Sequence, residues 1–254
     1  MSNFRSFSFD GLLSSGGPFP LEASSGPLCS ISLASAGRMK TGRDEANRRT
    51  FFTSLGIDPS RLASVSQVHS KTVYAVEDAR ELAEHPAGDG VITVNPDVVP
   101  CVTVADCMPI YLHDPVSGCF GVLHSGWKGT GIVGEALALA SRRWGARAED
   151  FYVLLGPHIR ECCYTVDAER ADYFTRGFGA SCVTLDRERE RSGSQWPWRL
   201  SLAEANRLHC VSVGIPSSRV ADSRSCTSCG FEYGSSRREG ADSFTHMAAF
   251  IALH

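Results

Sequence analysis

Residues 98–131 read VVPCVTVADCMPIYLHDPVSGCFGVLHSGWKGTG, and residues 132–144 continue the chain as IVGEALALASRRW. The first stretch contains three short apolar runs, residues 98–104, 109–113 and 119–124, and runs of this length predict strands. In the second stretch, apolar or small residues recur at positions 132, 133, 136, 137, 140 and 144. That spacing places them on one face of a helix. Strands followed by an amphipathic helix predict a fold of the α/β class.

The flanking sequence continues this mixture. Residues 44–55 predict a helix, because the acidic Asp44 can cap its start and Gly56 follows its end. The other predicted elements are strands at residues 64–69 and 151–155 and a helix at residues 202–213. The polar stretch 186–195, DRERERSGSQ, is expected to be an exposed excursion with solvated charges. Because no linker or repeat interrupts the chain, residues 1–254 are predicted to form a single domain.

Composition and charge narrow the classes of function. The 254 residues are 43% hydrophobic and carry a formal net charge of -3, which leaves no broad basic surface for nucleic acid. No apolar run approaches the length of a membrane span, and residues 1–10 lack the apolar stretch of a signal peptide. We therefore expect a cytoplasmic protein that binds neither nucleic acid nor membrane. In that compartment the 10 cysteines are expected to be reduced core thiols, metal ligands or nucleophiles.

Strand pairing is expected to bring two metal-competent side chains together. A hairpin loop at residues 114–117 would pair His113 with Gly118, and the same antiparallel register would place Cys107 opposite His124. Directly opposed residues have Cβ atoms roughly 5 Å apart, which is close enough to share one metal ion. Cys107 and His124 are therefore the first candidates for a functional site.

A catalytic zinc site of this kind needs a third protein ligand. Sites of the Cys-His-His type keep a fourth position free for water or substrate. His69 is the best candidate for the third ligand, because it ends the predicted strand at residues 64–69.

The remaining cysteine motifs are ambiguous. Cys226 and Cys229 have the CxxC spacing, but without a second such pair they fall short of a closed zinc site. Redox chemistry and plain packing are equally open for them. The adjacent Cys162 and Cys163 carry no clearer signal.

Five motifs follow one another along the chain. They are Gln67-Val68-His69, Gly88-Asp89-Gly90-Val91-Ile92-Thr93, Val104-Ala105-Asp106-Cys107-Met108-Pro109, His124-Ser125-Gly126-Trp127-Lys128-Gly129-Thr130 and Leu155-Gly156-Pro157-His158-Ile159. In this order they resemble the YfiH/laccase-domain family, and the resemblance extends from about Asn47-Arg48 to Gly240. Proteins of that family, long labelled multicopper polyphenol oxidases, are described as purine nucleoside phosphorylases with adenosine deaminase activity.

The resemblance implies a fold, a metal and a reaction. The implied fold is an α/β sandwich with mixed sheets flanked by helices, not a cupredoxin barrel. The zinc ligands of the family correspond to His69, Cys107 and His124, and Cu²⁺ could also occupy such a site. The implied reaction cleaves adenosine, inosine, guanosine or methylthioadenosine with phosphate, giving free base and ribose-1-phosphate (its 5-methylthio derivative from methylthioadenosine), with adenosine deamination as a side activity.

Several residues are expected to serve this chemistry. Gly126 and Gly129 leave backbone N–H groups free for an anion where a helix begins, and Lys128 adds positive charge. The other predicted phosphate or substrate ligands are Arg48, Arg237 and Arg238. For the proton shuttle of deamination, Asp106 is the first candidate because it adjoins the ligand cysteine, and Asp89 is the second.

Two positions depart from the family pattern. Lys128 follows the Gly-Trp pair where the family usually has arginine. A planar guanidinium that can bind two oxygens of an anion is thereby replaced by an ammonium group, which acts as a point charge. His246 stands where the family's C-terminal motif ends in arginine. We expect these departures to change the affinity for phosphate or the range of substrates.

Three alternative functions remain open from the sequence. The first is a copper-dependent polyphenol oxidase, although no two of the 8 histidines are two residues apart, as in the copper centres of laccases. The second is a metal-independent cysteine hydrolase with Cys107 as nucleophile, His124 as base and Asp106 or another carboxylate as orienting group. The third is a regulatory protein that binds metal without turnover.

Overall fold

The computed structural model describes residues 2–9 and 26–253. Its strands are β1 (Phe4–Phe7), β2 (Leu28–Ser32), β3 (Leu62–Ser64), β4 (Val73–Ala75), β5 (Gly90–Thr93), β6 (Val99–Val104), β7 (Met108–His113), β8 (Phe120–Ser125), β9 (Tyr152–Leu155), β10 (Thr165–Val166), β11 (Val183–Leu185), β12 (Trp198–Leu200), β13 (Val220–Asp222) and β14 (Met247–Ala252). Its helices are α2 (Glu45–Ser54), α3 (Ile132–Trp144), α4 (Ala168–Phe178), α5 (Arg187–Arg191), α6 (Leu202–Ser212) and α7 (Ser236–Glu239).

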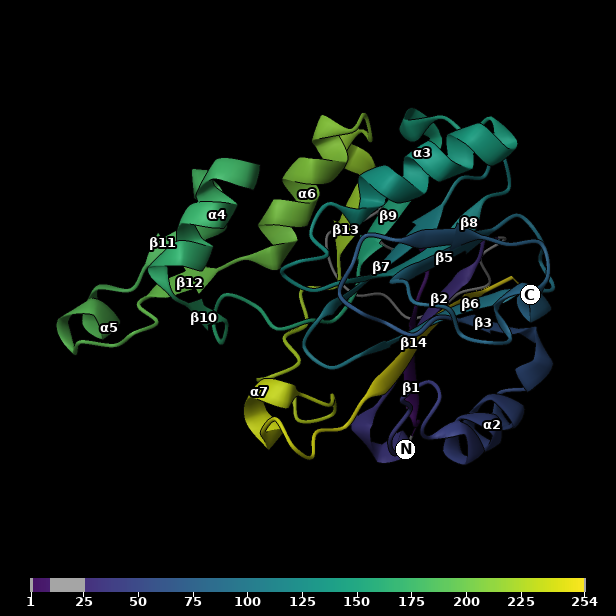
Figure 1. Cartoon of the computed structure of the whole chain (residues 1–254), viewed down its shortest axis with the longest axis horizontal. Helices are drawn as coiled ribbons and strands as arrows, with labels where there is room; N and C mark the ends of the chain where they lie inside the picture. Colours follow the sequence, from purple (N-terminus) through teal and green to yellow (C-terminus); the bar gives the residue numbers. More distant parts are fainter. Residues whose placement is uncertain (1, 10–25, 254) are drawn as a thin grey trace.

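Two mixed sheets form the centre of the molecule (Figure 1). One has the strand order β1-β2-β14-β6-β3 and the other the order β13-β9-β7-β8-β5-β4. Buried apolar side chains from both sheets share one cluster, including Val102 and Ile251 from the first and Phe120 and Val122 from the second. Tyr111 also crosses this interface, because its hydroxyl donates to the Ser30 carbonyl at 2.8 Å. The expected sandwich with mixed sheets is confirmed.

Helices cover the outer faces of both sheets, with α3 and α6 above and α2 below in Figure 1. The apolar stripe of α3, including Ile132, Val133 and Ala136, packs on the six-stranded sheet together with α6. On the five-stranded sheet, Phe51 and Phe52 of α2 supply the cover. The periodicity at residues 132–144 therefore predicted both the extent of α3 and its buried face.

The hairpin that joins β7 to β8 has a longer loop than predicted. The observed pairs are Pro109 with His124 and His113 with Phe120, so the expected pairing of Cys107 with His124 is wrong by two residues. The Asp114 carboxylate accepts the Val116 N–H at 2.8 Å and thereby stabilises the wider loop. Because side chains alternate with a period of two along a strand, a shift of two residues keeps the same face.

The predicted strand at residues 64–69 is also shorter in the structure. β3 ends at Ser64, and beyond it the Gln67 side chain takes the place of a strand partner. Its amide donates to the Thr103 carbonyl at 2.7 Å and accepts the Thr103 N–H at 2.6 Å. His69 therefore lies in a loop, with a φ of 59°.

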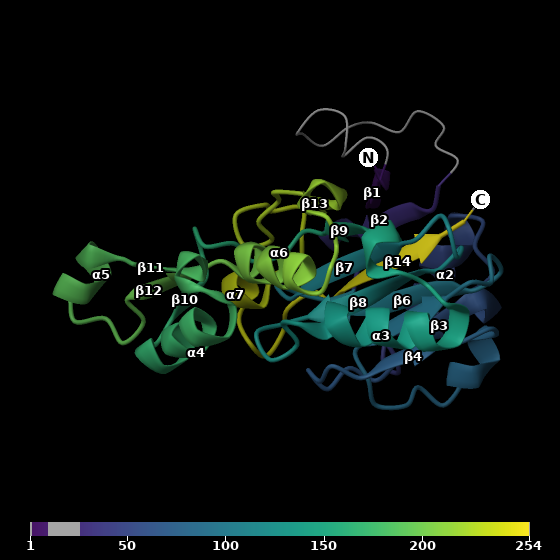
Figure 2. The same ribbon diagram turned by 90° about the horizontal axis from the view of Figure 1, so that it is seen from above.

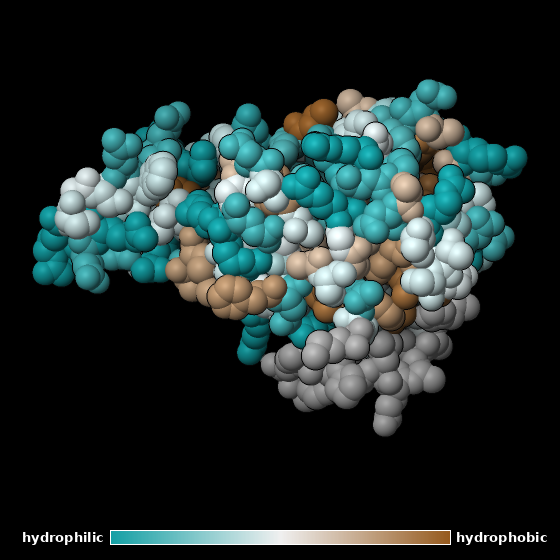
Figure 3. All heavy atoms as spheres, turned by 90° about the horizontal axis from the view of Figure 1, so that it is seen from below, coloured by the Kyte–Doolittle hydropathy of each residue, from teal (hydrophilic) through white to brown (hydrophobic). Residues whose placement is uncertain are grey.

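A lobe made of α4, α5 and the three-stranded sheet β10-β12-β11 extends from one end of the sandwich (Figure 2). Its Phe174 and Leu200 belong to the same buried cluster as the apolar face of α3, so one core runs through both parts. Its far end carries α5, whose five residues are all exposed, and hydrophilic side chains dominate there in Figure 3. The expected excursion at residues 186–195 is thus an exposed short helix and its flanks.

Among the described residues, no helix combines the length and the apolar character needed to cross a membrane.

Candidate functional site

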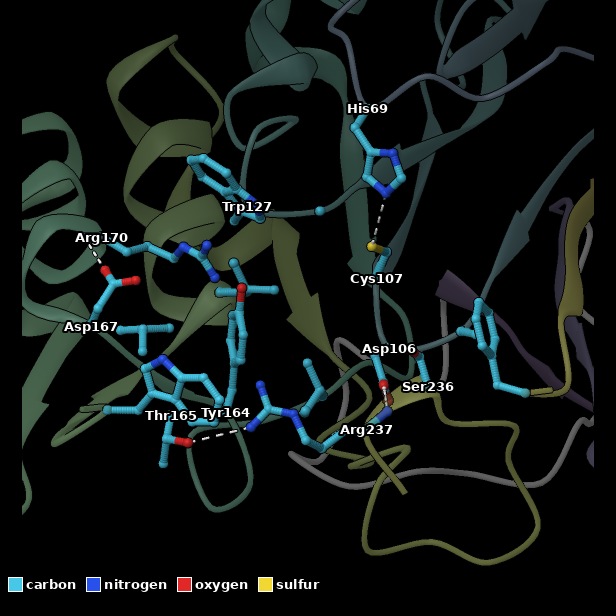
Figure 4. A pocket seen from close by; sticks show the side chains of 17 residues that line it. His69, Asp106, Cys107, Trp127, Tyr164, Thr165, Asp167, Arg170, Ser236 and Arg237 are labelled. Atoms are coloured by element: carbon cyan, nitrogen blue, oxygen red, sulfur yellow. Dashed lines mark hydrogen bonds between the residues drawn. The ribbon is translucent and has the colours of Figure 1, made fainter. Parts of the chain in front are cut away.

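Three side chains from three separate elements meet at one end of the sandwich. His124 lies on β8, Cys107 directly precedes β7, and His69 lies in the loop after β3. Their ligand atoms, two imidazole nitrogens and one sulfur, lie within 4.8 Å of one another. The Cys107 Sγ is 3.9 Å from the His69 Nε2 (Figure 4). The structure therefore brings together the three residues expected to hold a metal.

Asp89 sets the orientation of His124. The carboxylate is fully buried, and its Oδ1 lies 2.8 Å from the His124 Nδ1. This contact leaves the opposite ring nitrogen, Nε2, directed toward the other two ligand residues. Carboxylates that bind the second nitrogen of a ligand histidine fix its tautomer and ring orientation. Asp89 lines neither cavity at the triad, and its expected role as a second proton shuttle stays a prediction.

The same carboxylate holds the loop that carries His69. Its two oxygens accept N–H groups of Val68 at 3.3 Å, His69 at 3.1 Å and Ser70 at 2.6 Å. A left-handed backbone conformation is uncommon for residues other than glycine, and these hydrogen bonds stabilise it at His69. The exposed His69 ring makes one side of the triad accessible from the surface.

Gly126 and Gly129 have steric reasons to be glycine. A Cβ on Gly126 would lie 2.9 Å from the Cys107 Sγ and 3.2 Å from the His69 ring. A Cβ on Gly129 would lie 3.1 Å from the His124 carbonyl oxygen. Both glycines thus let the backbone pass close to the triad, and their role in holding phosphate stays a prediction.

Electrostatics within the triad favour a charged pair. Burial opposes ionisation of Cys107, but the nearby His124 and the hydrogen bonds from His124 and His69 lower its pKa to about 6. Burial likewise opposes charging of His124, but Cys107 and Asp89 raise its pKa to about 9. The thiolate that a metal site or a cysteine nucleophile requires is therefore present at neutral pH.

A cavity of about 630 Å³ opens beside His69 and Cys107 (Figure 4). Aromatic side chains from several elements line it: Trp127, Tyr164, Trp196 and Phe244. Arg170 also lines it, with its guanidinium carbon 4.4 Å from the Trp127 ring centroid. Only Trp127 belongs to one of the five motifs, and the other lining residues come from separate segments without a shared motif.

Two of the expected site residues face this cavity together. Arg237 lines it and donates to the Cys163 carbonyl at 3.2 Å and the Thr165 hydroxyl at 3.3 Å. Asp106, which has a φ of 76°, accepts the Arg237 backbone N–H at 2.7 Å and the Thr227 hydroxyl at 2.7 Å. Because Asp106 adjoins Cys107, its hydrogen bond to the Arg237 N–H connects the triad to the segment that carries Arg237.

Three other expected phosphate ligands lie elsewhere. Arg48 is 2% exposed and donates to the Met39 carbonyl and the Ser64 hydroxyl. Arg238 donates to the carbonyls of Thr227, Ser228 and Gly230. Lys128 is exposed, with its Nζ 5.3 Å from the Trp127 ring centroid. None of the three lines the large cavity.

His246 lies at a second, smaller cavity of about 240 Å³ that shares His69 and Cys107 with the first. Burial lowers the pKa of His246 to about 4, and the positive charge of Lys40 acts in the same direction. His246 is therefore uncharged at neutral pH and does not supply the positive charge of the arginine that the family motif has there.

Comparisons with known proteins show which proteins the chain resembles. A family model described as multi-copper polyphenol oxidoreductase laccase matches residues 22–254. The purine nucleoside phosphorylase YlmD of Geobacillus stearothermophilus is 33% identical over 249 residues, covering 90% of this chain and 85% of that protein. The adenosine deaminase RL5 of an unknown prokaryotic organism is 29% identical over 206 residues, covering 77% of each chain. The solved structure of the YfiH protein of Bacillus licheniformis matches with a TM-score of 0.79 at 27% identity, covering 90% of this chain and 93% of that chain.

Proposed function

The chain belongs to the family described as multi-copper polyphenol oxidoreductase laccase, and from this premise we propose that it is a zinc-dependent purine nucleoside phosphorylase. Its substrates would be adenosine, inosine, guanosine or methylthioadenosine, together with phosphate. A relative that covers 90% of the chain at 33% identity bears the name purine nucleoside phosphorylase. The observation that carries the proposal is the triad His69, Cys107 and His124, of which His69 and Cys107 line an aromatic cavity.

The donor set of the triad fits zinc. One thiolate and two imidazoles are ligands that Zn²⁺ commonly takes, and three protein ligands leave one position open. His69 and Cys107 line the cavity, so a substrate bound in it would lie beside the metal that they would hold. When bound there, zinc supplies Lewis acidity next to the substrate.

Copper oxidation fits the described residues less well. The described residues contain two groups of possible metal ligands, this triad and a cluster of four cysteines. Neither has the several histidines that a trinuclear copper centre needs, which favours the phosphorylase over the polyphenol oxidase.

The large cavity suits a purine nucleoside. Trp127, Tyr164 and Trp196 offer flat apolar surfaces on which a purine base can stack. A volume of about 630 Å³ lies within the usual range for a small-molecule site, roughly 300 to 1,000 Å³. The base would therefore lie among these rings, with its sugar directed toward the triad.

Arg237 is the residue that we propose for phosphate. It lines the same cavity, its guanidinium lies over the Tyr164 ring at 5.7 Å, and Thr165 and Cys163 restrict its position. A planar guanidinium can bind two phosphate oxygens at once. The anion held there would stabilise the positive charge that develops on the sugar as the bond to the base breaks.

Asp106 would move the proton in deamination of adenosine, the second candidate function. The relative named adenosine deaminase, at 29% identity, favours this activity. Each oxygen of Asp106 accepts one hydrogen bond, and a carboxylate oxygen has a further lone pair that can accept a proton. Both reactions would use one cavity and one triad.

Product analysis separates these functions. Zinc-loaded protein is incubated with adenosine, with and without inorganic phosphate, and the products are separated by chromatography. We expect adenine and ribose-1-phosphate only when phosphate is present, whereas inosine marks deamination. Zinc-replete protein that releases no free base from any of the four nucleosides when each is tested in turn, and no inosine from adenosine, would instead identify a metal-binding protein without turnover.

Substitution of Arg237 tests the phosphate site. We expect Arg237→Gln to raise the apparent KM for phosphate by about 10- to 100-fold, because a hydrogen bond to a charged group contributes about 1.5–3 kcal/mol. The KM for the nucleoside should change much less. Steady-state kinetics with phosphate and inosine varied separately measure both constants.

The matched control is Arg219→Gln. Arg219 also lies over a tyrosine ring, that of Tyr152 at 4.7 Å, and donates to a backbone carbonyl, but it does not line the large cavity. Its substitution should leave both constants unchanged. If Arg237→Gln raised the KM for the nucleoside and not that for phosphate, Arg237 would bind the sugar or base.

A further inference from the structure

Four cysteines that are far apart in the sequence meet near the surface of the protein. Cys162 and Cys163 lie between β9 and β10, and Cys226 and Cys229 lie between β13 and α7. The Cys229 Sγ is 3.2 Å from that of Cys163 and 3.6 Å from that of Cys162. All four sulfur atoms lie within 4.8 Å of one another, so the two sequence pairs form one four-thiol cluster.

The spacing of the sulfur atoms matches a single tetrahedral metal ion. With Zn–S bonds of about 2.3 Å, the sulfurs of a tetrahedral site are separated by roughly 3.8 Å. The upper limit of 4.8 Å in the four-thiol cluster leaves room for one ion. In a four-iron cluster each cysteine binds a different iron atom, which spreads the sulfurs farther apart.

Charge balance favours a cation in the four-thiol cluster, whose sulfur atoms all lie within 4.8 Å of one another. Four thiols this close cannot all ionise unless a cation balances them, and a coordinated thiol is deprotonated by the metal.

The rest of the fold holds this turn in place. Thr227 donates its N–H to the His158 carbonyl at 3.0 Å, and Gly230 donates to the Cys226 carbonyl at 2.9 Å. Arg238 donates to three carbonyls of the same turn, those of Thr227, Ser228 and Gly230. The turn is thus positioned by contacts other than those among the cysteines, as expected for a preorganised binding site.

We propose that Cys162, Cys163, Cys226 and Cys229 bind a second zinc ion in a closed structural site. Four thiolates fill all four positions of a tetrahedral ion, whereas the triad leaves one open. The two sites therefore differ in donor set and in role.

The structural zinc would stabilise the segments that position two residues of the large cavity, Asp106 and Arg237. Thr227, between the two cysteines of the turn, donates its hydroxyl to Asp106 at 2.7 Å. The carbonyl of Cys163 accepts the Arg237 guanidinium at 3.2 Å. A metal that joins the two cysteine pairs would fix the segments that position Asp106 and Arg237. The metal site itself does not depend on the proposed reaction.

Metal content tests this site without any activity assay. Wild-type protein purified under reducing conditions with excess zinc should contain about two zinc ions per chain, and Cys226→Ser about one. Cys107→Ala should also contain about one, and the double variant none. The control Cys182→Ser, a buried cysteine outside both groups, should keep two.

Cobalt spectra show which site has been lost. Co²⁺ bound by four thiolates has more sulfur-to-metal charge transfer than Co²⁺ bound by one thiolate and two imidazoles. We expect Cys226→Ser to lose most of this absorption and Cys107→Ala to keep most of it. In wild-type protein, the four cysteines should resist alkylation by iodoacetamide until a chelator is added, a measurement that needs no variant.

Several outcomes would overturn the structural zinc site. They are a single equivalent of zinc in the wild-type protein that Cys226→Ser retains, two equivalents retained by Cys226→Ser, iron in place of zinc, or a mass deficit that reveals disulfides among the four cysteines in protein kept under reducing conditions.

Discussion

Replacing Cys107 with alanine is expected to remove the metal of the triad and to reduce kcat/KM for nucleoside phosphorolysis by at least about 10³-fold, equivalent to about 4 kcal/mol. The thiolate is the one anionic ligand in the triad, and its pKa of about 6 means that it is charged at neutral pH. Without it, two imidazoles remain, of which His124 has a pKa raised by the same sulfur. Metal analysis and phosphorolysis kinetics on the same preparation measure both losses.

This substitution alone does not distinguish a metal ligand from a nucleophile. A chelator provides the distinction, because a cysteine hydrolase would keep its activity when the metal is removed and lose it on thiol alkylation. We expect activity to disappear with chelation and to return with added zinc. The control Cys182→Ser should match the wild type in metal content and rate. Activity that survives complete removal of metal would reject the zinc mechanism and favour the cysteine hydrolase.

Replacing Asp89 with asparagine is expected to weaken zinc binding at the triad by about 10- to 100-fold. The backbone N–H groups of Val68 and Ser70 require an oxygen where Oδ2 now lies, which would turn the amide nitrogen toward the His124 Nδ1. The amide N–H would then donate to Nδ1, so that the proton of the neutral ring moves to Nε2, the nitrogen needed for the metal. Competition with a chromophoric zinc chelator measures the change in affinity.

The change at Asp89 also lowers the free energy of unfolding, so its effect on metal must be separated from that on stability. Asp114→Asn is the matched control, because Asp114 is also a fully buried aspartate that accepts loop N–H and O–H groups. It lies in the β7–β8 loop and lines neither cavity at the triad. We expect Asp114→Asn to destabilise the fold and to leave zinc affinity unchanged. Equal losses of zinc affinity in both variants would show that Asp89 acts only through stability.

The sequence predicted which residues form the candidate site more accurately than it predicted how those residues are arranged. Cys107 and His124 were paired through a register that proved wrong by two residues, yet both belong to the triad. A two-residue shift preserves the face of a strand, and Cys107 precedes β7 beside the strained Asp106. His69 was placed at the end of a strand but lies in a loop held by Asp89. The motifs thus indicated which residues act together, and the contacts that join them came from the structure.

Residue type alone did not show which arginine faces the cavity. Arg48, Arg237 and Arg238 were equivalent as predicted anion ligands. The structure directs Arg237 into the cavity, whereas Arg48 and Arg238 donate to backbone carbonyls. A guanidinium serves either purpose equally well, so only its surroundings distinguish a ligand from a structural brace.

The sequence by itself determined the features that depend on short stretches of chain. These are the α/β class, the length and buried face of α3, the strands β6, β7 and β8, and the three residues of the triad. Each follows from a local periodicity or motif, because neighbours within about ten residues already set the pattern. The tertiary structure decided the aromatic cavity and the four-thiol cluster, in which Cys162 and Cys163 meet Cys226 and Cys229. The two cysteine pairs are more than 50 residues apart, and successive aromatic residues of the cavity are more than 30 residues apart. Only the packing of the sheets and the lobe determines that those segments lie together.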